Sequence, residues 1–457
     1  MKVTRLEATD VHGYLPIAVS FLPDLTFLTG LNGSGKTSAL KLLMGLLTPD
    51  LEELAGIQFV RARVTVLDNE QTRTIEAVRS DDSLTVSTSG VPEELKLDTA
   101  ELELLAQGRR REEARMPLQE KIRAHPVFKS VHAMSTPMFL GLDRRFFAPG
   151  GAADERHDLR LREHVMRRHM LEEHQWANAA GLIDVNVLLS SSLQRVRFAQ
   201  EQLDNRLRNE ILVGAFQYKR SNVESLTGMP SRADLENYKK RQLAAEKAVR
   251  GLKLPVEDVQ RALTVFFERM TEVVENLEKT AQSGGKKKGK RHVPTTDMFD
   301  WIMNRPQTDR ILEHLKLLEQ YNIDRAKLHE SIDNFIALVN RFLTQTTKSV
   351  ELSNEGELRV IHHGAKGASR PIWALSSGER QIVVMLAHLS LNPRLAGSGV
   401  FIVDEPELSL HLAWQERFVD AIRTANPNVQ LIMATHSPAI ILDHTENCRS
   451  LSEAPLL

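Results

Sequence analysis

The chain has 457 residues, 42% hydrophobic and 26% charged, as expected of a soluble globular protein with material for about two to three domains. Its formal net charge of −1 excludes a strongly basic or acidic protein, so any nucleic-acid surface has to be a local patch. The single cysteine, Cys448, excludes an internal disulfide framework. Since neither a signal-peptide pattern nor an apolar run of about 20 residues occurs, we expect a cytoplasmic protein without membrane contact.

The first informative stretch is GLNGSGKTS at residues 30–38, which lies between a short apolar strand (Leu25–Thr29) and a helix. It matches the pattern G-x-x-x-x-G-K-[ST]. Its glycines let backbone N–H groups turn toward phosphate oxygens, and the helix presents its positive end to the same anion. Lys36 can reach the β- and γ-phosphates, and the Thr37 hydroxyl can bind Mg²⁺. We therefore predict a nucleotide site made of Gly30, Asn32, Gly33, Ser34, Gly35, Lys36, Thr37 and Ser38.

Three stretches of alternating apolar residues come next: RARVTVLD (61–68), TRTIEAVR (72–79) and LTVSTS (84–89). Alternation with a period of two is typical of strands with one buried face, so these stretches predict an antiparallel sheet. From about Gly150 the pattern changes to that of helices. Turn signals at TGMPS (227–231) and GLKLP (251–255) divide this region into several shorter helices.

Two of these helices place apolar residues alternately four and three positions apart, which is typical of a coiled-coil seam or of a bundle core. The residues are Val259, Leu263, Phe266, Met270, Val273 and Leu277 in the first helix, and Leu328, Ile332, Phe335, Val339 and Phe342 in the second. Each run lasts only about three heptads, so both interpretations stay open.

A flexible, strongly cationic loop is predicted at residues 282–296, QSGGKKKGKRHVPTT. It combines lysines and an arginine with glycines and contains no aromatic residue. Such a loop can contact the phosphate backbone of nucleic acid without reading the sequence, or it can be a solvated linker. Both interpretations stay open. The charged segments at 109–115 and 156–169 also interleave acidic with basic residues, as exposed helix faces do.

Further along the chain, LSSGERQ (375–381) places small hydrogen-bonding residues before a helix at Gln381–Leu391, which predicts a second positive helix end. A continuous apolar run, Val400–Val403, then predicts a buried parallel strand. It delivers Asp404 and Glu405 at its carboxyl end, where α/β sheets bind ligands. Asp404 is predicted to approach Mg²⁺, and Glu405 to activate the attacking water as a general base.

A second apolar run, Val429–Ala434, predicts another buried parallel strand and ends at Thr435, His436 and Ser437. A histidine at a strand end is usually an ordinary polar residue. Because this strand is expected beside the acidic one, His436 is predicted to reach the γ-phosphate.

The set GLNGSGKTS, LSSGE, VDEPE, SLHLAWQ and ATHSP resembles the ATP-binding-cassette (ABC) ATPases of the AAA family, over roughly residues 1–145 and 346–457. The resemblance implies ATP and Mg²⁺ as ligands, with Thr37 and Asp404 at the metal, and catalytic roles for Lys36, Glu405 and His436. LSSGE stands at the family's signature, which serves the nucleotide of a neighbouring subunit. The resemblance therefore implies at least a homodimer, in which ATP is also contacted by Ser376, Ser377, Gly378 and Glu379.

One part of the family pattern has no match. The family's glutamine loop is expected at TPMFLGLDRRF (136–146), which contains no glutamine. Asp143, Arg144 or a water is expected to take its place.

The expected fold class is α/β, with a split ABC head built from a RecA-like parallel sheet and an antiparallel N-terminal sheet. We assign residues 1–148 and 346–457 to the head and 149–345 to a helical, partly coiled-coil insertion. This order resembles the RecF and SMC-like branch rather than transporter ATPases.

Within that branch, DEPELSLHLAWQ and ATHSPAII resemble stand-alone ATPase subunits of anti-phage defence systems of the PARIS or Septu type. The resemblance implies a sensor or regulatory ATPase that holds or activates a separately encoded effector, such as a nuclease. We expect no nuclease centre on this chain, because only about 20 residues follow ATHSP, too few for a further domain. Two alternatives stay open: a RecF-like ATPase that clamps duplex DNA, and a nucleotide-gated scaffold with negligible turnover.

Overall fold

The computed structural model describes residues 1–106, 112–134, 137–140, 146–147, 173–216, 236–237, 240, 243–244, 257–283, 295–364, 369–395 and 399–451. The chain forms two compact units, Met1–Leu193 with Ser331–Leu457 and Gln194–Glu330. These limits fall inside helices α7 (Glu173–Phe216) and α11 (Thr295–Leu343). The division at 149 and 345 drawn from the sequence stays a proposal. Among the described helices, none is both long and apolar enough to cross a bilayer.

The first unit contains a mostly parallel six-stranded sheet of order β15-β3-β14-β13-β8-β9. Its strands are β3 (Leu25–Thr29), β8 (Met138–Leu140), β9 (Phe146–Phe147), β13 (Gly399–Asp404), β14 (Val429–Ala434) and β15 (Cys448–Ser450). Only the β8–β9 pair is antiparallel. Every residue of β13 and β14 is buried, as expected of parallel strands with both faces covered. This sheet combines β3, β8 and β9 from the N-terminal part of the chain with β13, β14 and β15 from the C-terminal part, so the head is split in sequence.

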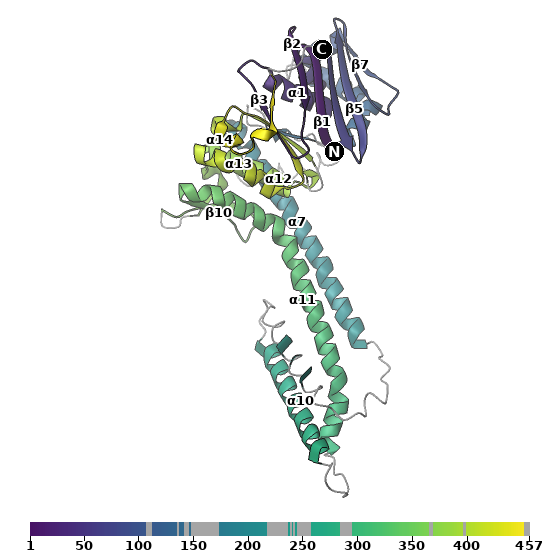
Figure 1. Ribbon diagram of the computed structural model, residues 1–457, viewed down its shortest axis with the longest axis vertical. Coiled ribbons are helices and arrows are strands. Elements are labelled where there is room, and N and C mark those ends of the chain that lie inside the picture. Colours follow the sequence, from purple (N-terminus) through teal and green to yellow (C-terminus); the bar gives the residue numbers. More distant parts are fainter. Residues whose placement is uncertain are drawn as a thin grey trace. The chain divides into compact units, whose positions relative to one another are not determined.

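A second six-stranded sheet is entirely antiparallel and has the order β2-β1-β4-β5-β6-β7. Its strands are β1 (Lys2–Val11), β2 (Leu15–Ser20), β4 (Arg61–Asp68), β5 (Gln71–Ser80), β6 (Ser83–Thr88) and β7 (Leu95–Asp98). The three strands predicted between residues 61 and 89 are β4, β5 and β6. The predicted α/β fold, with a parallel and an antiparallel sheet and a helical insertion, is confirmed (Figure 1).

Buried Gln430 on β14 joins the two sheets. Its Oε1 accepts from the Val3 backbone N–H at 2.7 Å, and its Nε2 donates to the Val3 and Leu22 carbonyls at 2.8 and 2.7 Å. The Gln430 amide thus ties the first strand of the chain to a strand more than 400 residues later. Separating the two sheets would break these hydrogen bonds and leave buried polar groups without partners, which costs stability.

Helices cover the sheets of this unit. They are α1 (Lys36–Leu47), α2 (Leu51–Ala55), α3 (Thr99–Ala106), α4 (Glu112–Ala124), α5 (Pro126–His132), α12 (Ser377–Leu391), α13 (Leu412–Ala425) and α14 (Pro438–Ile441). A small antiparallel sheet, β10 (Lys348–Leu352), β11 (Leu358–His362) and β12 (Ser369–Pro371), follows α11. The end of α11 packs into this unit, since Ile332, Phe335, Val339 and Phe342 are buried. The Phe342 ring meets Trp414 edge to face, with centroids 6.0 Å apart.

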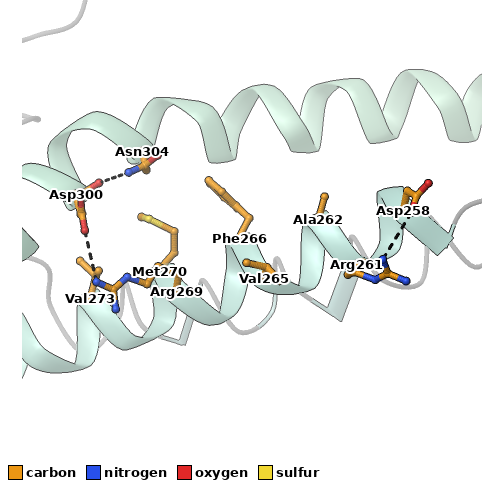
Figure 2. A pocket seen from close by; sticks show the side chains of 10 residues that line it. All are labelled: Asp258, Arg261, Ala262, Val265, Phe266, Arg269, Met270, Val273, Asp300 and Asn304. Atoms are coloured by element: carbon orange, nitrogen blue, oxygen red, sulfur yellow. Dashed lines mark hydrogen bonds and ion pairs between the residues drawn. The ribbon is translucent and has the colours of Figure 1, made fainter.

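The second unit contains α10 (Glu257–Ser283), which packs against the first half of α11. Its core is formed by Phe267, Met270, Val273, Val274, Leu277, Trp301 and Leu315. Three of the apolar residues predicted at four- and three-residue spacing in α10, Met270, Val273 and Leu277, are thus core residues. Both a coiled-coil seam and a bundle core require this, so the coiled-coil seam stays a prediction. A groove of about 640 Å³ is lined by residues of α10 and by Asp300 and Asn304 of α11. Figure 2 shows Phe266 and Met270 pointing from α10 toward α11.

Parts of the sequence predictions lie outside the described residues. These are residues 284–294 of the basic loop, the charged segment 156–169, and the turn signals at 227–231 and 251–255.

Candidate active site

Three neighbouring parallel strands end at the same edge of the sheet. Leu28 on β3 is in register with Ala434 on β14, and Ala434 is in register with Asp404 on β13. The chain segments that follow these residues therefore emerge side by side. They carry the glycine-rich loop, His436 and Glu405, so the sheet brings together the groups that the sequence predicted at separate strand ends.

The glycine-rich loop turns through left-handed backbone. Gly30, Gly33 and Gly35 have φ values of 148°, 85° and 88°. A Cβ atom at Gly35 would also lie 2.4 Å from Leu15 Cδ2, so a side chain there would strain the backbone and would require the end of Leu15 to shift. The hydroxyl of Ser34 is buried and has no hydrogen-bond partner among the described residues. This loop offers unpaired donors ahead of the N-terminus of α1, as an anion site requires.

Lys36 begins α1 and is 5% exposed. Its Nζ donates to the Gly30 and Leu31 carbonyls at 3.1 and 3.3 Å, so the ammonium group lies under the loop. Burial lowers the pKa of Lys36, while the nearby carboxylates, Glu405 first, act in the opposite direction. The side chain is placed to exchange these two carbonyls for phosphate oxygens, which are stronger partners for an ammonium group.

Asp404 ends β13 and is 3% exposed. Burial raises its pKa to about 6, against a smaller opposite effect of the Thr37 hydroxyl. Thr37 is near enough to favour the charged form, yet neither Asp404 oxygen has a well-formed hydrogen bond among the described residues. Two buried, unpaired carboxylate oxygens beside a threonine hydroxyl fit a divalent cation, since Mg²⁺ prefers hard oxygen ligands. Thr37 and Asp404 would hold it.

Glu405 and His436 face each other across the strand ends. The His436 Nε2 lies 3.9 Å from Glu405 Oε1. Glu405 has left-handed backbone, with φ of 46°, and its N–H donates to the Ala434 carbonyl at 2.9 Å. A non-glycine residue in this region costs about 1 to 2 kcal/mol, so the fold holds Glu405 at this orientation against an intrinsic preference.

The signature turn is a capped helix start. Ser376 is the N-cap of α12, and a reciprocal capping box joins its side chain and backbone N–H to Glu379. Ser376 and Ser377 are exposed, and Gly378 is half-buried. No hydrogen bond or ion pair joins these residues to the glycine-rich loop of the same chain, within the residues described.

Glu379 differs from the other predicted nucleotide contacts, because it is 2% exposed and its carboxylate faces inward. The carboxylate accepts from Lys348 Nζ at 2.9 Å, from Thr346 Oγ1 at 2.8 Å and from the Ser376 N–H at 2.7 Å. These hydrogen bonds lower the pKa of Glu379 against the effect of burial. We propose that Glu379 supports the signature turn and does not itself contact a nucleotide.

Several site residues were not predicted from the sequence. Glu407, the second glutamate of VDEPE, accepts from Thr435 Oγ1 at 2.8 Å and from the His436 N–H at 2.6 Å. His12 Nε2 and Ser38 Oγ, at the start of α1, are 2.9 Å apart. The sequence shows that Glu407 lies two residues after Glu405, but it does not show that Glu407 binds the residues that follow β14. The segment proposed for the glutamine loop contains β8, which pairs with β13, and its Asp143 and Arg144 lie outside the described residues.

The arrangement at this sheet edge is that of P-loop nucleotide-binding proteins, and comparisons with known proteins agree. A family model described as "AAA domain, putative AbiEii toxin, Type IV TA system" matches residues 261–443, less than half of the chain. The matched range includes Asp404, Glu405 and His436. This part of the chain is therefore similar to the AAA domains that the family model describes.

Two curated relatives are similar over shorter stretches. "Retron Vc95 probable ATPase" of Vibrio cholerae serotype O1 biovar El Tor is 28% identical over 123 residues, 25% of this chain. "Retron Ec83 probable ATPase" of Escherichia coli is 33% identical over 134 residues, 27% of this chain. The matches span 22% and 23% of the length of these relatives.

Among solved structures, the Smc head domain with a coiled coil and joint from Pyrococcus yayanosii aligns over 98% of this chain and 94% of its own, with 12% identity and a TM-score of 0.36. The Smc head domain with an extended coiled coil, bound to the C-terminal domain of ScpA, from Pyrococcus furiosus aligns over 98% and 93%, with 11% identity and a TM-score of 0.38.

The buried Asp404 gives a stability prediction. Its folded pKa of about 6 lies above the usual 3.8, so folding favours the protonated form and the free energy of unfolding falls as pH rises between these values. Asp404→Asn should therefore raise the free energy of unfolding at pH 8 by about 1 to 2 kcal/mol, allowing for solvent screening, and the gain should vanish near pH 4.

Urea unfolding of the nucleotide-free protein at both pH values measures this difference. Asp81→Asn, at an exposed turn residue, is the control and should change little. A variant less stable than the parent at pH 8 would contradict the prediction.

Proposed function

We propose that this chain binds Mg²⁺–ATP and hydrolyses it, as the regulatory ATPase of a prokaryotic anti-phage defence complex. The observation that carries the proposal is the convergence of Lys36, Asp404, Glu405 and His436 at one edge of the parallel sheet. A phosphate-binding loop, a buried and a partly exposed carboxylate, and a histidine at adjoining strand ends form the set that phosphoryl transfer to water needs.

Each residue has a role in this reaction. The glycine-rich loop and Lys36 bind the phosphates, and Lys36 balances the charge that develops on them. When Mg²⁺ is bound, it neutralises charge on the β- and γ-phosphate oxygens. Glu405 orients the attacking water and accepts its proton, which requires an ionised carboxylate at the phosphate edge. His436, which lies across from Glu405, donates a hydrogen bond to the γ-phosphate.

The assembly is proposed to be a homo-oligomer of at least two copies. Ser376, Ser377 and Gly378 lie at the N-terminus of α12, where backbone N–H groups and the helix dipole favour an anion. Since no bond links them to the loop of their own chain among the described residues, they are available to the nucleotide of a second copy.

The defence role is supported by similarity to the two retron ATPases and by the motif resemblance to stand-alone ATPases of defence systems. The partner in this proposal is a separately encoded effector, of which a nuclease is the favoured kind. The helical second unit, with several exposed apolar side chains, is the proposed docking surface; these include Phe198, Val213, Phe216, Val265, Phe299 and Met303.

The test is to purify the chain with the products of its neighbouring genes and to measure mass and phosphate release in Mg²⁺ and ATP. We expect a complex that contains a second protein and that releases phosphate, with release abolished when EDTA removes Mg²⁺. A bare dimer that retains duplex DNA at moderate salt would favour the RecF-like alternative instead. Capture of a second protein without phosphate release would favour the nucleotide-gated scaffold.

A further inference from the structure

A closed set of hydrogen bonds ties the loop after β14 to the loop after β13. Glu407 Oε1 accepts from both Thr435 Oγ1, at 2.8 Å, and the His436 backbone N–H, at 2.6 Å. Thr435 Oγ1 accepts in turn from the Ser437 N–H at 3.0 Å. One carboxylate oxygen thus holds both the Thr435 side chain and the His436 backbone N–H to the segment that follows β13.

The same loop is held from its other side by α13. The Ser437 hydroxyl donates to Gln415 Oε1 at 2.6 Å, and Gln415 Nε2 donates to the Leu410 carbonyl at 2.8 Å and to the Glu407 carbonyl at 3.4 Å. Gln415 therefore connects the residue after His436 with the backbone of the segment that contains Glu407. With both contacts made, neither loop can shift without breaking a bond to the other.

Part of this hydrogen-bonded set is buried. Thr435 is 1% exposed, and the second oxygen of Glu407, Oε2, is buried without a partner among the described residues. Burial of an unpaired carboxylate oxygen costs stability, so the position of Glu407 is not explained by a solvated glutamate at the surface. Its charge also lies close enough to Lys36 to favour the ammonium form there.

We infer that Glu407 is a positioning residue for ATP hydrolysis, which acts by holding His436 at its short distance from Glu405, with Gln415 as its support. The inference rests on the proposed function. Glu407 does not touch the reacting atoms in this role. It acts through the backbone of His436, whose imidazole lies 3.9 Å from the proposed base. Backbone fixing of this kind matters because misplacement of a catalytic group by about 1 Å can cost on the order of 100-fold in rate.

The test combines kinetics with backbone exchange in three variants. Glu407→Ala removes the oxygen that accepts both hydrogen bonds, and it should lower kcat on the order of 10-fold while the Kd for ATP stays unchanged, because the phosphate loop is not altered. Glu407→Gln keeps an Oε1 acceptor and should restore most of the rate. Glu416→Ala, at an exposed glutamate beside Gln415 on α13, is the matched control and should behave as the parent.

The double variant decides whether Glu407 acts through His436. We expect His436→Ala to lower kcat on the order of 100-fold, and Glu407→Ala to have little further effect in that background, because the group it positions is gone. Independent, additive losses of the two side chains would overturn the inference.

Hydrogen exchange separates this inference from the proposed function. Amide exchange in peptides that cover 435–441 should be about 10-fold faster in Glu407→Ala than in the parent, and near the parental rate in Glu407→Gln. Unchanged exchange in Glu407→Ala would overturn the positioning role even if ATP is hydrolysed. Faster exchange in Glu407→Ala, together with a parent that does not hydrolyse ATP, would support the hold on the His436 loop and reject the proposed function alone.

Discussion

Replacing Glu405 by Gln should lower kcat for ATP hydrolysis on the order of 100- to 1000-fold while leaving ATP binding intact. The amide has the same shape as the carboxylate but cannot accept the proton of the attacking water at neutral pH. Lys36, Thr37 and Asp404, which would bind the phosphates and Mg²⁺, keep their positions. Single-turnover phosphate release and equilibrium binding of ATP measure the two quantities separately.

The same variant should accumulate as a closed oligomer in ATP, because hydrolysis is the step that would release a nucleotide held between two copies. Light scattering with and without ATP measures the mass. Glu416→Gln, on the exposed side of α13, serves as the control. Hydrolysis at the parental rate in Glu405→Gln would show that a different group is the base, with Asp404 and Glu407 as the nearest carboxylates by sequence.

Much of this site could be predicted because its residues follow continuous apolar runs. Leu25–Thr29, Val400–Val403 and Val429–Ala434 are too apolar to lie anywhere but in the buried centre of a sheet. Parallel strands end at one edge, so the loops that follow them meet there. The sequence alone therefore indicated which groups would converge, although it did not specify the strand order.

Other parts depend on contacts between distant segments, which local patterns do not encode. The spacing of Ser376 and Glu379 is that of a capping box and can be read from the sequence. The burial of Glu379 against Lys348 cannot, because it depends on where the chain returns from α11. Glu407 is a similar case, since its partners lie 28 and 29 residues later, in the loop after β14. Short edge strands such as β12 have too few residues to give a period.

Lys36→Ala should lower the affinity for ATP on the order of 100-fold, since a charge-assisted bond between the ammonium group and the phosphates is lost. Ser377→Glu should spare ATP binding by its own chain but should block hydrolysis, because it places a negative charge at the exposed start of α12, where the phosphate of a neighbouring copy is proposed to lie. An acidic residue in the first turn favours the helix, so the fold should be kept. Urea unfolding checks that both variants are folded.

Mixing these two inactive variants should recover activity if each nucleotide is shared between copies. A mixed dimer joins the intact glycine-rich loop of the Ser377→Glu copy to the intact signature of the Lys36→Ala copy, which makes one complete site. Purification by two different tags isolates the mixed dimers, each of which has one of two sites, so we expect about half of the parental rate. Co-expressed, differently tagged copies purified in tandem provide the measurement. A rate no higher than that of either variant alone would show that each site is built within one chain, and would place the signature turn outside the nucleotide site.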